Sequence, residues 1–303
     1  MEKIVITGAN GQDGLILSEI LVKKKFKVYG IIKKKKYKNK IKKVKYLNLN
    51  LLNYKEVEKK LIQIKPDCIV HFASQNPSYK ELKNKKNFFS ENMSVLKNII
   101  NYIKKNDNKI RLIFPGSSQM YGEQHRRVNE QTKFKPKNNY SVFRVKSHKM
   151  LMSFKKKYKL KFSTVILFNH DSKFRNKKFL IPRIVKAIKK KNKFFLQKIT
   201  GENIYADFSH AYDICYGIYL LIKSKKNYNK IILSSNRLTS VNEIILFLIK
   251  LINSKLNIVD NKLARKNKKI IGDNKKARVL LNWKQKKNIF LASKEFLKKN
   301  YNV

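Results

Sequence analysis

The first fourteen residues constrain the fold of this chain more than any other segment. A short apolar run, Lys3–Thr7, is followed at once by Gly8, Gly11 and Gly14, and apolar positions then recur at helical spacing. Glycines three apart between a strand and a helix let the backbone approach a pyrophosphate, which the helix N-terminus binds through its N–H groups. The strand–turn–helix context therefore predicts a dinucleotide-binding turn.

Apolar runs of strand length alternate with helix-length periodic segments through the first half of the chain. The predicted strands are residues 3–7, 27–32, 44–48, 68–72, 111–116 and 162–168. The predicted helices are residues 14–24, 55–65, 88–105 and 140–158. This alternation predicts an α/β fold of the Rossmann type, with a doubly wound parallel sheet.

The second half of the chain has a less regular pattern. Helices are predicted at 181–190, 211–223 and 241–251, with a short strand at 230–233. We expect a dinucleotide-binding domain over residues 1–168, to which residues 207–235 or so return. A smaller substrate-binding region is expected over residues 169–206 and 236–303.

The formal net charge of +53 is extreme, but its distribution argues against a nucleic-acid-binding function. Lysines are spread over nearly every surface segment, as in proteins encoded by AT-rich genomes. Such a charge attracts nucleic acid non-specifically at low salt. The sequence contains no zinc-ligand spacing, basic zipper or aromatic–glycine RNA motif. We therefore expect no specific nucleic-acid partner and no metal.

Cysteine usage and hydropathy indicate the compartment. Cys68 and Cys215 lie in apolar stretches and are predicted to be core residues. The longest apolar stretch, Ile244–Ile252, is interrupted by Lys250 and is too short to span a bilayer. Met1 stands directly against the first strand, which predicts no secretory leader. We expect a soluble, cytoplasmic protein.

The end of the second predicted strand bears on the choice of cofactor. An acidic residue there bonds the adenosine 2′-hydroxyl and favours NAD. Here Ile32 is followed by Lys33 and Lys34, with no carboxylate nearby. This favours NADP over NAD, with a lysine facing the 2′-phosphate.

Two further strand ends complete the predicted dinucleotide pocket. Asn50 and Leu51, after the third strand, are expected at the adenine edge. Phe72, Ala73, Ser74 and Gln75, after the fourth, are expected along the pyrophosphate and ribose.

A candidate catalytic set follows the fifth predicted strand. Ser117 stands at the strand end, and about twenty residues later Tyr140 and Arg144 lie four apart on a predicted helix. That spacing points both side chains the same way. A cation beside a phenol favours the phenolate, which can exchange a proton with a sugar hydroxyl while a hydride moves to a nicotinamide. The serine is expected to bond the same sugar oxygen.

Four ordered segments carry a resemblance to a known family. They are Thr7–Gly14, Leu167–Ser172, Asp207–Asp213 and Gly272–Ala277, the last followed by Trp283. With them, the chain resembles the extended short-chain dehydrogenases that act on nucleotide sugars, the NAD-dependent epimerase/dehydratase family. Within that family it is most similar to the GDP-mannose 4,6-dehydratases.

This resemblance implies a Rossmann domain with a small substrate domain, assembled as a homodimer or homotetramer. It also implies tightly bound NADP and conversion of GDP-mannose to GDP-4-keto-6-deoxymannose. The catalytic positions are Ser117, Gln119, Tyr140 and Arg144. The cofactor positions are Gly8, Asn10, Gly11, Gln12, Asp13, Gly14, Lys33, Asn50, Leu51, Phe72, Ala73, Ser74, Tyr140, Arg144, Asn169 and His170. The substrate positions are Ser118, Asn169, Arg183 and Arg265.

Several positions depart from the pattern of the family. Gln119 stands where the family has the glutamate that removes the C5 proton, and an amide is no base at neutral pH. Arg144 replaces the lysine four residues after the tyrosine. Asn50 replaces an adenine-contacting aspartate, and Ala206 replaces a basic residue that contacts substrate phosphate.

Three functions remain open from the sequence. The chain is a 4,6-dehydratase in which another group, such as His170 or Glu123, replaces the base. Alternatively, it performs only redox chemistry at C4, as a 4-keto reductase or epimerase acting on a 4-keto derivative. In the third case it binds the cofactor without catalysis.

Overall fold

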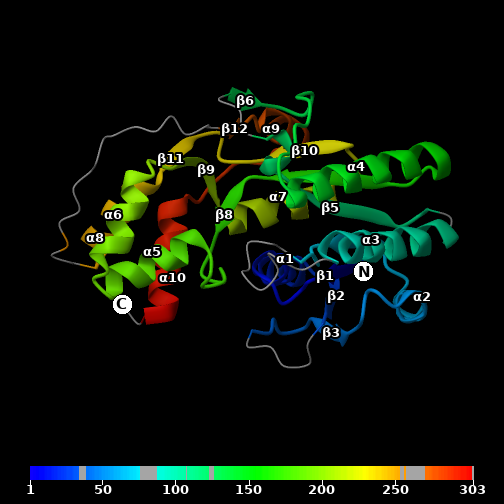
Figure 1. Ribbon diagram of the computed structural model, residues 1–303. Coiled ribbons are helices and arrows are strands. Elements are labelled where there is room, and N and C mark those ends of the chain that lie inside the picture. The colour runs from blue at the N-terminus through cyan, green and yellow to red at the C-terminus, as the bar shows by residue number, and fades with distance from the viewer. Residues whose placement is uncertain are drawn as a thin grey trace. The chain divides into compact units, whose positions relative to one another are not determined.

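Figure 1 shows a computed structural model of the chain, which describes residues 1–33, 39–75, 87–106, 108–122, 126–252, 256 and 270–301. The chain forms two compact units. The first consists of Met1–Gly122, Phe134–Ile166 and Cys215–Ile231. The second consists of Glu123–Lys133, Leu167–Ile214 and Ile232–Val303. The chain returns to the first unit over Cys215–Ile231, whereas the sequence suggested a return over residues 207–235 or so.

A seven-stranded parallel sheet organises the first unit, which confirms the predicted fold class. Its strand order is β10-β7-β5-β4-β1-β2-β3. The strands are β1 (Lys3–Thr7), β2 (Lys27–Ile32), β3 (Lys45–Asn48), β4 (Cys68–His71), β5 (Arg111–Ser117), β7 (Phe162–Leu167) and β10 (Lys230–Leu233). The order reverses between β1 and β4, and ligands of such sheets bind where the order reverses.

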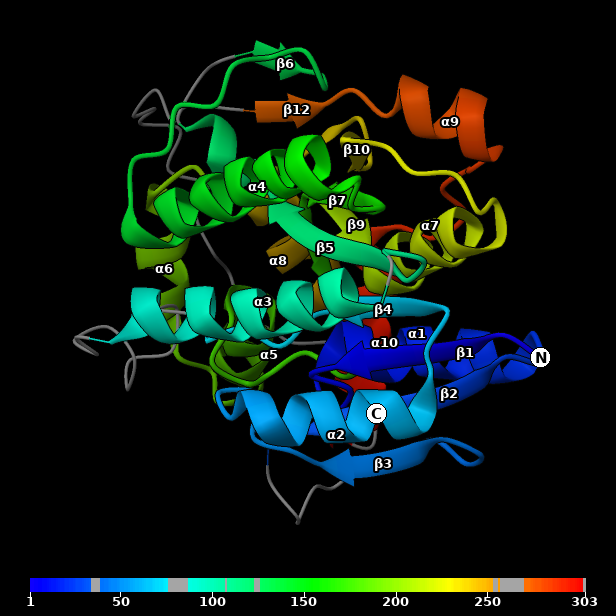
Figure 2. The same cartoon turned by 90° about the vertical axis from the view of Figure 1, so that its right-hand side faces the viewer.

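Within the described residues, five helices accompany this sheet. They are α1 (Gln12–Lys23), α2 (Tyr54–Ile64), α3 (Phe88–Lys105), α4 (Asn139–Tyr158) and α7 (Ala211–Lys223). Figure 2 shows α2, α3 and α4 in a row in front of the strands. A short 3₁₀ turn, η2 (Ser118–Tyr121), follows β5.

The core of the first unit follows from the sequence pattern. Ile4, Val5 and Ile6 of β1 are fully buried, because helices cover both faces of a parallel sheet. In α3, Leu96, Ile99, Ile100 and Ile103 form one buried stripe at spacings of three and four. This stripe packs with strand residues in a single apolar cluster.

The described part of the second unit contains two small sheets and several helices. β11 (Leu238–Ser240), β9 (Tyr205–His210) and β8 (Asn169–Asp171) form one sheet, and β12 (Ile270–Gly272) pairs with β6 (Arg126–Val128) in another. The helices are α5 (Leu180–Lys189), α6 (Lys193–Gly201), α8 (Val241–Leu251), α9 (Lys275–Leu281) and α10 (Ile289–Tyr301). Residues of α5, α6, α8 and α10 share one apolar core, and these helices lie together in Figure 1.

Both cysteines are free and buried, as predicted. Burial raises the pKa of the Cys68 thiol to about 12, so it stays protonated. Among the helices in the described ranges, none combines the length and the apolar composition needed to span a bilayer.

Candidate functional site

The glycine turn between β1 and α1 is shaped by two different requirements. Gly8 has φ +70°, and a Cβ there would lie 2.9 Å from the Ala73 backbone nitrogen. A Cβ on Gly14 would lie 2.5 Å from the Gly8 carbonyl oxygen. A Cβ on Gly11 would meet only that same oxygen, at 3.3 Å. Contacts with the chain's own backbone therefore explain the glycines at positions 8 and 14. At Gly11 they do not, and there the absence of a side chain leaves room for a ligand to approach the backbone.

A buried histidine ties the ends of β1 and β4 together. The Thr7 hydroxyl accepts a hydrogen bond from the Ala73 backbone nitrogen (3.1 Å) and lies 2.8 Å from His71 Nδ1. Burial, and after it the positive charge of Arg144, lower the pKa of His71 to about 3. The ring is therefore neutral at physiological pH and acts as a fixed partner of Thr7.

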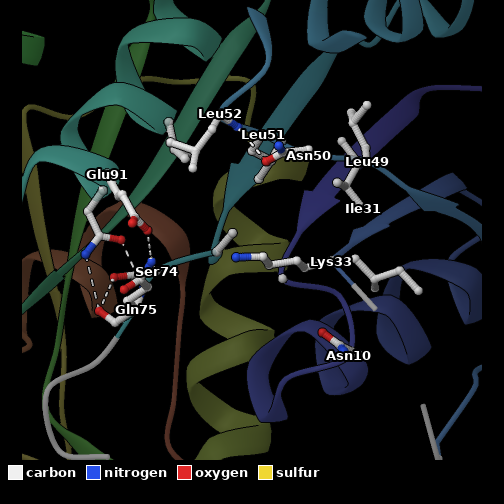
Figure 3. A pocket seen from close by; sticks show the side chains of 15 residues that line it. Asn10, Ile31, Lys33, Leu49, Asn50, Leu51, Leu52, Ser74, Gln75 and Glu91 are labelled. Atoms are coloured by element: carbon white, nitrogen blue, oxygen red, sulfur yellow. Dashed lines mark hydrogen bonds between the residues drawn. The ribbon is translucent and has the colours of Figure 1, made fainter. Parts of the chain in front are cut away.

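A pocket of about 330 Å³ opens at the carboxyl ends of β1, β2, β3 and β4. Figure 3 shows Lys33 extending across it, with Asn10 and Asn50 on different sides. The pocket is lined by Gly8, Asn10, Ile31, Ile32, Lys33, Leu49, Asn50, Leu51, Leu52, Ala73, Ser74, Gln75, Glu91, Asn92 and Val95. Its volume and mostly apolar lining suit a small-molecule ligand.

The structure brings seven predicted cofactor residues together around this pocket. They are Gly8, Asn10, Lys33, Asn50, Leu51, Ala73 and Ser74. Gly11, Gln12, Asp13 and Gly14 form the adjoining cap and first turn of α1. The Asn50 side-chain oxygen accepts a hydrogen bond from the Leu52 backbone nitrogen (3.2 Å). Phe72 immediately follows β4.

One wall of the pocket was predicted only in part, because Gln75 was expected there but the residues from α3 were not. Gln75 donates its backbone N–H to the Asn92 side chain (3.0 Å) and its side-chain amide to Glu91. Figure 3 shows Gln75 and Glu91 facing each other. The spacing of Glu91, Asn92 and Val95 at the start of α3 was the available signal, because those positions share a helix face.

Ser117 ends β5 with its hydroxyl turned to the backbone of η2. The Ser117 Oγ accepts a hydrogen bond from the Gln119 backbone nitrogen (3.3 Å). A hydroxyl that accepts in this way retains its own hydrogen for donation to a ligand oxygen.

Arg144 is a buried cation beside Tyr140. Its side chain is 6% exposed, and its Nη1 donates a hydrogen bond to the Pro115 carbonyl (2.9 Å). The guanidinium carbon lies 5.1 Å from the centre of the Tyr140 ring and 5.3 Å from that of Phe114. Its Nε has no hydrogen-bond partner in the described part of the chain. The positive charge is thus held next to the tyrosine ring.

A second contact joins α4 to η2. The Asn138 side-chain nitrogen donates a hydrogen bond to the Gln119 side-chain oxygen (3.1 Å). The approach is fixed by Gly122, whose φ is +73° and whose Cβ would lie 2.2 Å from the Lys135 carbonyl oxygen. Lys135 also donates its N–H to the Met120 carbonyl (2.9 Å). Asn138 was missed by the sequence analysis, although Asn-x-x-Ser before a helix signals a capping box.

Of the remaining predicted residues, one lies in the first unit, three lie in the second unit, and the others lie outside the described ranges. Asn169 and His170 are in β8, where His170 Nδ1 donates to the Phe168 carbonyl (2.7 Å). Arg183 is in α5, with its guanidinium 4.9 Å from the Phe195 ring centre. Ser118 begins η2 in the first unit. Lys34, Glu123 and Arg265 lie outside the described residues.

Asp207 organises the strand on which Ala206 lies. Its carboxylate accepts hydrogen bonds from the Ser235 N–H (2.7 Å) and hydroxyl (2.6 Å), and from the Asn236 and Gly272 N–H groups (both 3.1 Å). It therefore ties β9 to the turn after β10 and to β12. Within the described ranges, no group of three or more histidine, cysteine or acidic residues is arranged to hold a metal ion.

Comparison with known proteins assigns the family. A sequence model described as GDP-mannose 4,6 dehydratase matches residues 5–295. The chain belongs to this family. As a member of the GDP-mannose 4,6 dehydratase family, it falls among the nucleotide-sugar dehydratases and epimerases, which are enzymes.

Curated relatives of this family member are distant. GDP-mannose 4,6 dehydratase 1 of Arabidopsis thaliana is 25% identical over 253 residues, covering 73% of this chain and 67% of that protein. GDP-mannose 4,6 dehydratase 2 of Caenorhabditis elegans is 27% identical over 230 residues, covering 68% and 59%. The UDP-glucose 4-epimerase of Mycoplasma genitalium is 26% identical over 201 residues, covering 60% and 58%. The matches thus span about three fifths to two thirds of the length of these relatives.

Solved structures confirm the fold. The dTDP-glucose 4,6-dehydratase of Bacillus anthracis, solved with NAD, superimposes with a TM-score of 0.83 at 15% identity, covering 100% of this chain and 97% of that one. The UDP-Glc/GlcNAc 4-epimerase of Campylobacter jejuni gives a TM-score of 0.83 at 19% identity, with 100% of both chains covered.

Proposed function

We propose that this chain binds NADP and acts on C4 of the hexose in a nucleotide sugar, with 4,6-dehydration of GDP-mannose as the first candidate reaction. The observation that carries the proposal is the pairing of Tyr140 with the buried Arg144 at the end of β5, where Ser117 also lies. This set shares a unit with the dinucleotide pocket.

The residues of the pocket fit a dinucleotide. Gly11 presents bare backbone at the start of α1, and no side chain in the described ranges caps that helix. A helix N-terminus of this kind favours a pyrophosphate. Lys33 lines the pocket at the end of β2, where a 2′-phosphate is expected. These features support NADP, held by the glycine turn, Lys33, Asn50 and Ala73–Ser74. When bound, its nicotinamide supplies hydride exchange with C4.

The chain's own groups then handle the proton at the C4 oxygen. Tyr140 takes the hydroxyl proton as C4 is oxidised, and returns it when the ketone is reduced. The Ser117 hydroxyl donates a hydrogen bond to the same oxygen. Arg144 places its buried positive charge beside the Tyr140 ring, where it faces the oxygen that exchanges the proton.

Dehydration needs a further group to remove the C5 proton. The family assignment favours this reaction and favours GDP-mannose as its substrate. The sequence offers His170 as one candidate for this base, and in the second unit its Nδ1 donates a hydrogen bond to the Phe168 carbonyl. Glu123 is the other candidate.

Redox chemistry alone, as a 4-keto reductase or epimerase, is the second candidate. Gln119 favours it, because an amide at the position of the family's base cannot accept the C5 proton. Ser117, Tyr140 and Arg144 suffice for that reaction.

Mass spectrometry separates these candidates. Incubation with GDP-mannose and catalytic NADP is expected to give a product one water lighter if dehydration occurs. Consumption of NADPH with a nucleotide-activated 4-keto-6-deoxy sugar, with no water loss from GDP-mannose, supports the second candidate. If neither occurs while NADPH binds in a titration, the chain is a cofactor-binding protein and the proposal fails.

A further inference from the structure

The Asn138 side chain makes two hydrogen bonds with opposite polarity. As the N-cap of α4, its Oδ1 accepts the Ser141 backbone N–H (2.9 Å). Its Nδ2 donates to the side-chain oxygen of Gln119 (3.1 Å). All three residues belong to the first unit.

These contacts determine the orientations of the side-chain amides of Asn138 and Gln119. A backbone N–H can only donate, so the Asn138 atom at the cap must be the oxygen. The atom facing Gln119 is therefore the Asn138 nitrogen, and a nitrogen donor requires the Gln119 oxygen opposite it. The orientation of the Gln119 amide thus follows from the helix cap alone.

The Gln119 nitrogen is the group left for a ligand. No residue in the described ranges accepts a hydrogen bond from it, and the side chain is exposed. We propose that Asn138 is a positioning residue which holds Gln119 with its amide N–H₂ presented as a hydrogen-bond donor, so that the site takes nucleotide sugars with an oxygen at this point and changes them without loss of water.

The proposal rests on the proposed function and deepens its second candidate, redox chemistry at C4, at the expense of dehydration. A donor cannot remove a carbon-bound proton, but it stabilises a hydroxyl or ketone oxygen of the sugar. If residue 119 were a glutamate, one carboxylate oxygen would accept the hydrogen bond from Asn138 and the other would remain available as a base. The same cap therefore orients either residue, and residue 119 decides between dehydration and redox chemistry alone.

The first test uses NADPH oxidation with a nucleotide-activated 4-keto-6-deoxy sugar. Gln119→Met is expected to lower kcat/KM about tenfold, the value of one lost hydrogen bond. Asn138→Asp keeps a good helix cap but accepts from Gln119, so the amide turns over and presents its oxygen. The same loss of about tenfold is expected, with no further loss when Asn138→Asp is added to Gln119→Met.

A matched control separates positioning from helix capping. Asn192 caps α6 through the Phe195 N–H (2.9 Å), in the second unit. Asn192→Asp is expected to leave kcat/KM unchanged, and thermal unfolding should shift equally little in both Asp variants. Additive losses from Asn138→Asp and Gln119→Met would overturn the positioning role.

A second test requires no substrate. In Gln119→Glu labelled with ¹³C-glutamate, the added carboxyl is expected to titrate at lower pH with Asn138 present than with Asn138→Asp, because Asn138 donates and aspartate repels. Identical titration in the two backgrounds would overturn the proposal. A clear difference, with no nucleotide sugar turned over, would uphold the orientation of Gln119 while the proposed function fails.

Discussion

Gly14 is the position where α1 comes closest to the turn that precedes it. An added methyl group would lie 2.5 Å from the Gly8 oxygen and 2.6 Å from the Ala9 Cα. Gly14→Ala is therefore expected to lower the free energy of unfolding by about 1–3 kcal/mol, since backbone must move.

Gly201→Ala, measured in the same urea unfolding experiment, is the control for that prediction. Gly201 ends α6, and nothing lies within 4 Å of its added Cβ. This substitution is expected to be neutral or to stabilise by up to about 1 kcal/mol, because alanine favours a helix. Equal effects of the two substitutions would contradict the close approach at Gly14.

His71 is expected to make the first unit sensitive to acid. Its pKa is lowered from 6.5 to about 3 by burial and by the charge of Arg144. The unfolded chain therefore binds a proton at higher pH than the folded one. Stability from the neutral ring is complete above about pH 6.5 and is lost as pH falls toward about 3.

His71→Gln, which stays uncharged, checks this sign. The stability of the natural chain relative to the variant is expected to decline as pH falls below about 6.5 in urea unfolding experiments. A difference that stays constant between pH 7 and pH 4, or that grows on acidification, would show that His71 does not titrate as described.

Single residues of the site differ in how well the sequence predicts them. Gly8, Lys33 and Ala73 could be placed because the strand ends of this fold class meet at one edge of the sheet. Asn138 could not be matched with Gln119 in this way. Their contact depends on the close approach of Lys135 to Gly122, and no local sequence pattern predicts that approach.

Two elements of the first unit, η2 and the start of α4, carry residues of the predicted catalytic set. Gly122 lets them meet, since a Cβ there would lie 2.2 Å from the Lys135 oxygen. Gly122→Ala is expected to displace them and to lower turnover by about 10², as misplacement of catalytic groups does.

Binding of NADPH provides the internal control for Gly122→Ala. The dinucleotide pocket is built from the ends of β1 to β4 and the start of α3, away from this crossing. Affinity measured by fluorescence titration is therefore expected to stay unchanged. A parallel loss of NADPH affinity and turnover would mean that the substitution unfolds the whole unit.

Elements with a strong local pattern were predicted closely. β1, β2, α3, α7, α8 and β10 have the predicted bounds, because apolar runs and helical stripes are visible in the sequence alone. β6 and β12 were missed, since each has three residues and forms only by pairing with the other. β9 was missed because it contains polar residues, including Asp207. The Asp207 carboxylate is stabilised by hydrogen bonds from segments that lie far away in the sequence.

The charge of the whole molecule predicts a binding property distinct from its chemistry. At +53 the chain is expected to bind duplex DNA of any sequence at low salt. Affinity should fall by roughly 10³ or more between 50 and 200 mM salt, as counterion release requires. Fluorescence anisotropy with two unrelated duplexes measures this, and a preference for one duplex that survives at high salt would contradict a non-specific origin.

The two units interleave along the chain, and this is also a property of the whole molecule. Strand–helix alternation predicts the first unit, because each element packs on the sheet next to it. Helices α6, α9 and α10 were not predicted; α10 packs its apolar residues in one core with α5 and α8, which are far from it in the sequence.

The most direct measurement for the central claim is the mass of the sugar product formed with NADPH. The account predicts that a nucleotide-activated 4-keto-6-deoxy sugar gains two hydrogens, and that Tyr140→Phe abolishes this gain while NADPH still binds. The account would be contradicted if the natural chain added no hydrogen to any sugar in a panel of GDP-, UDP- and dTDP-linked substrates and also removed no water from GDP-mannose.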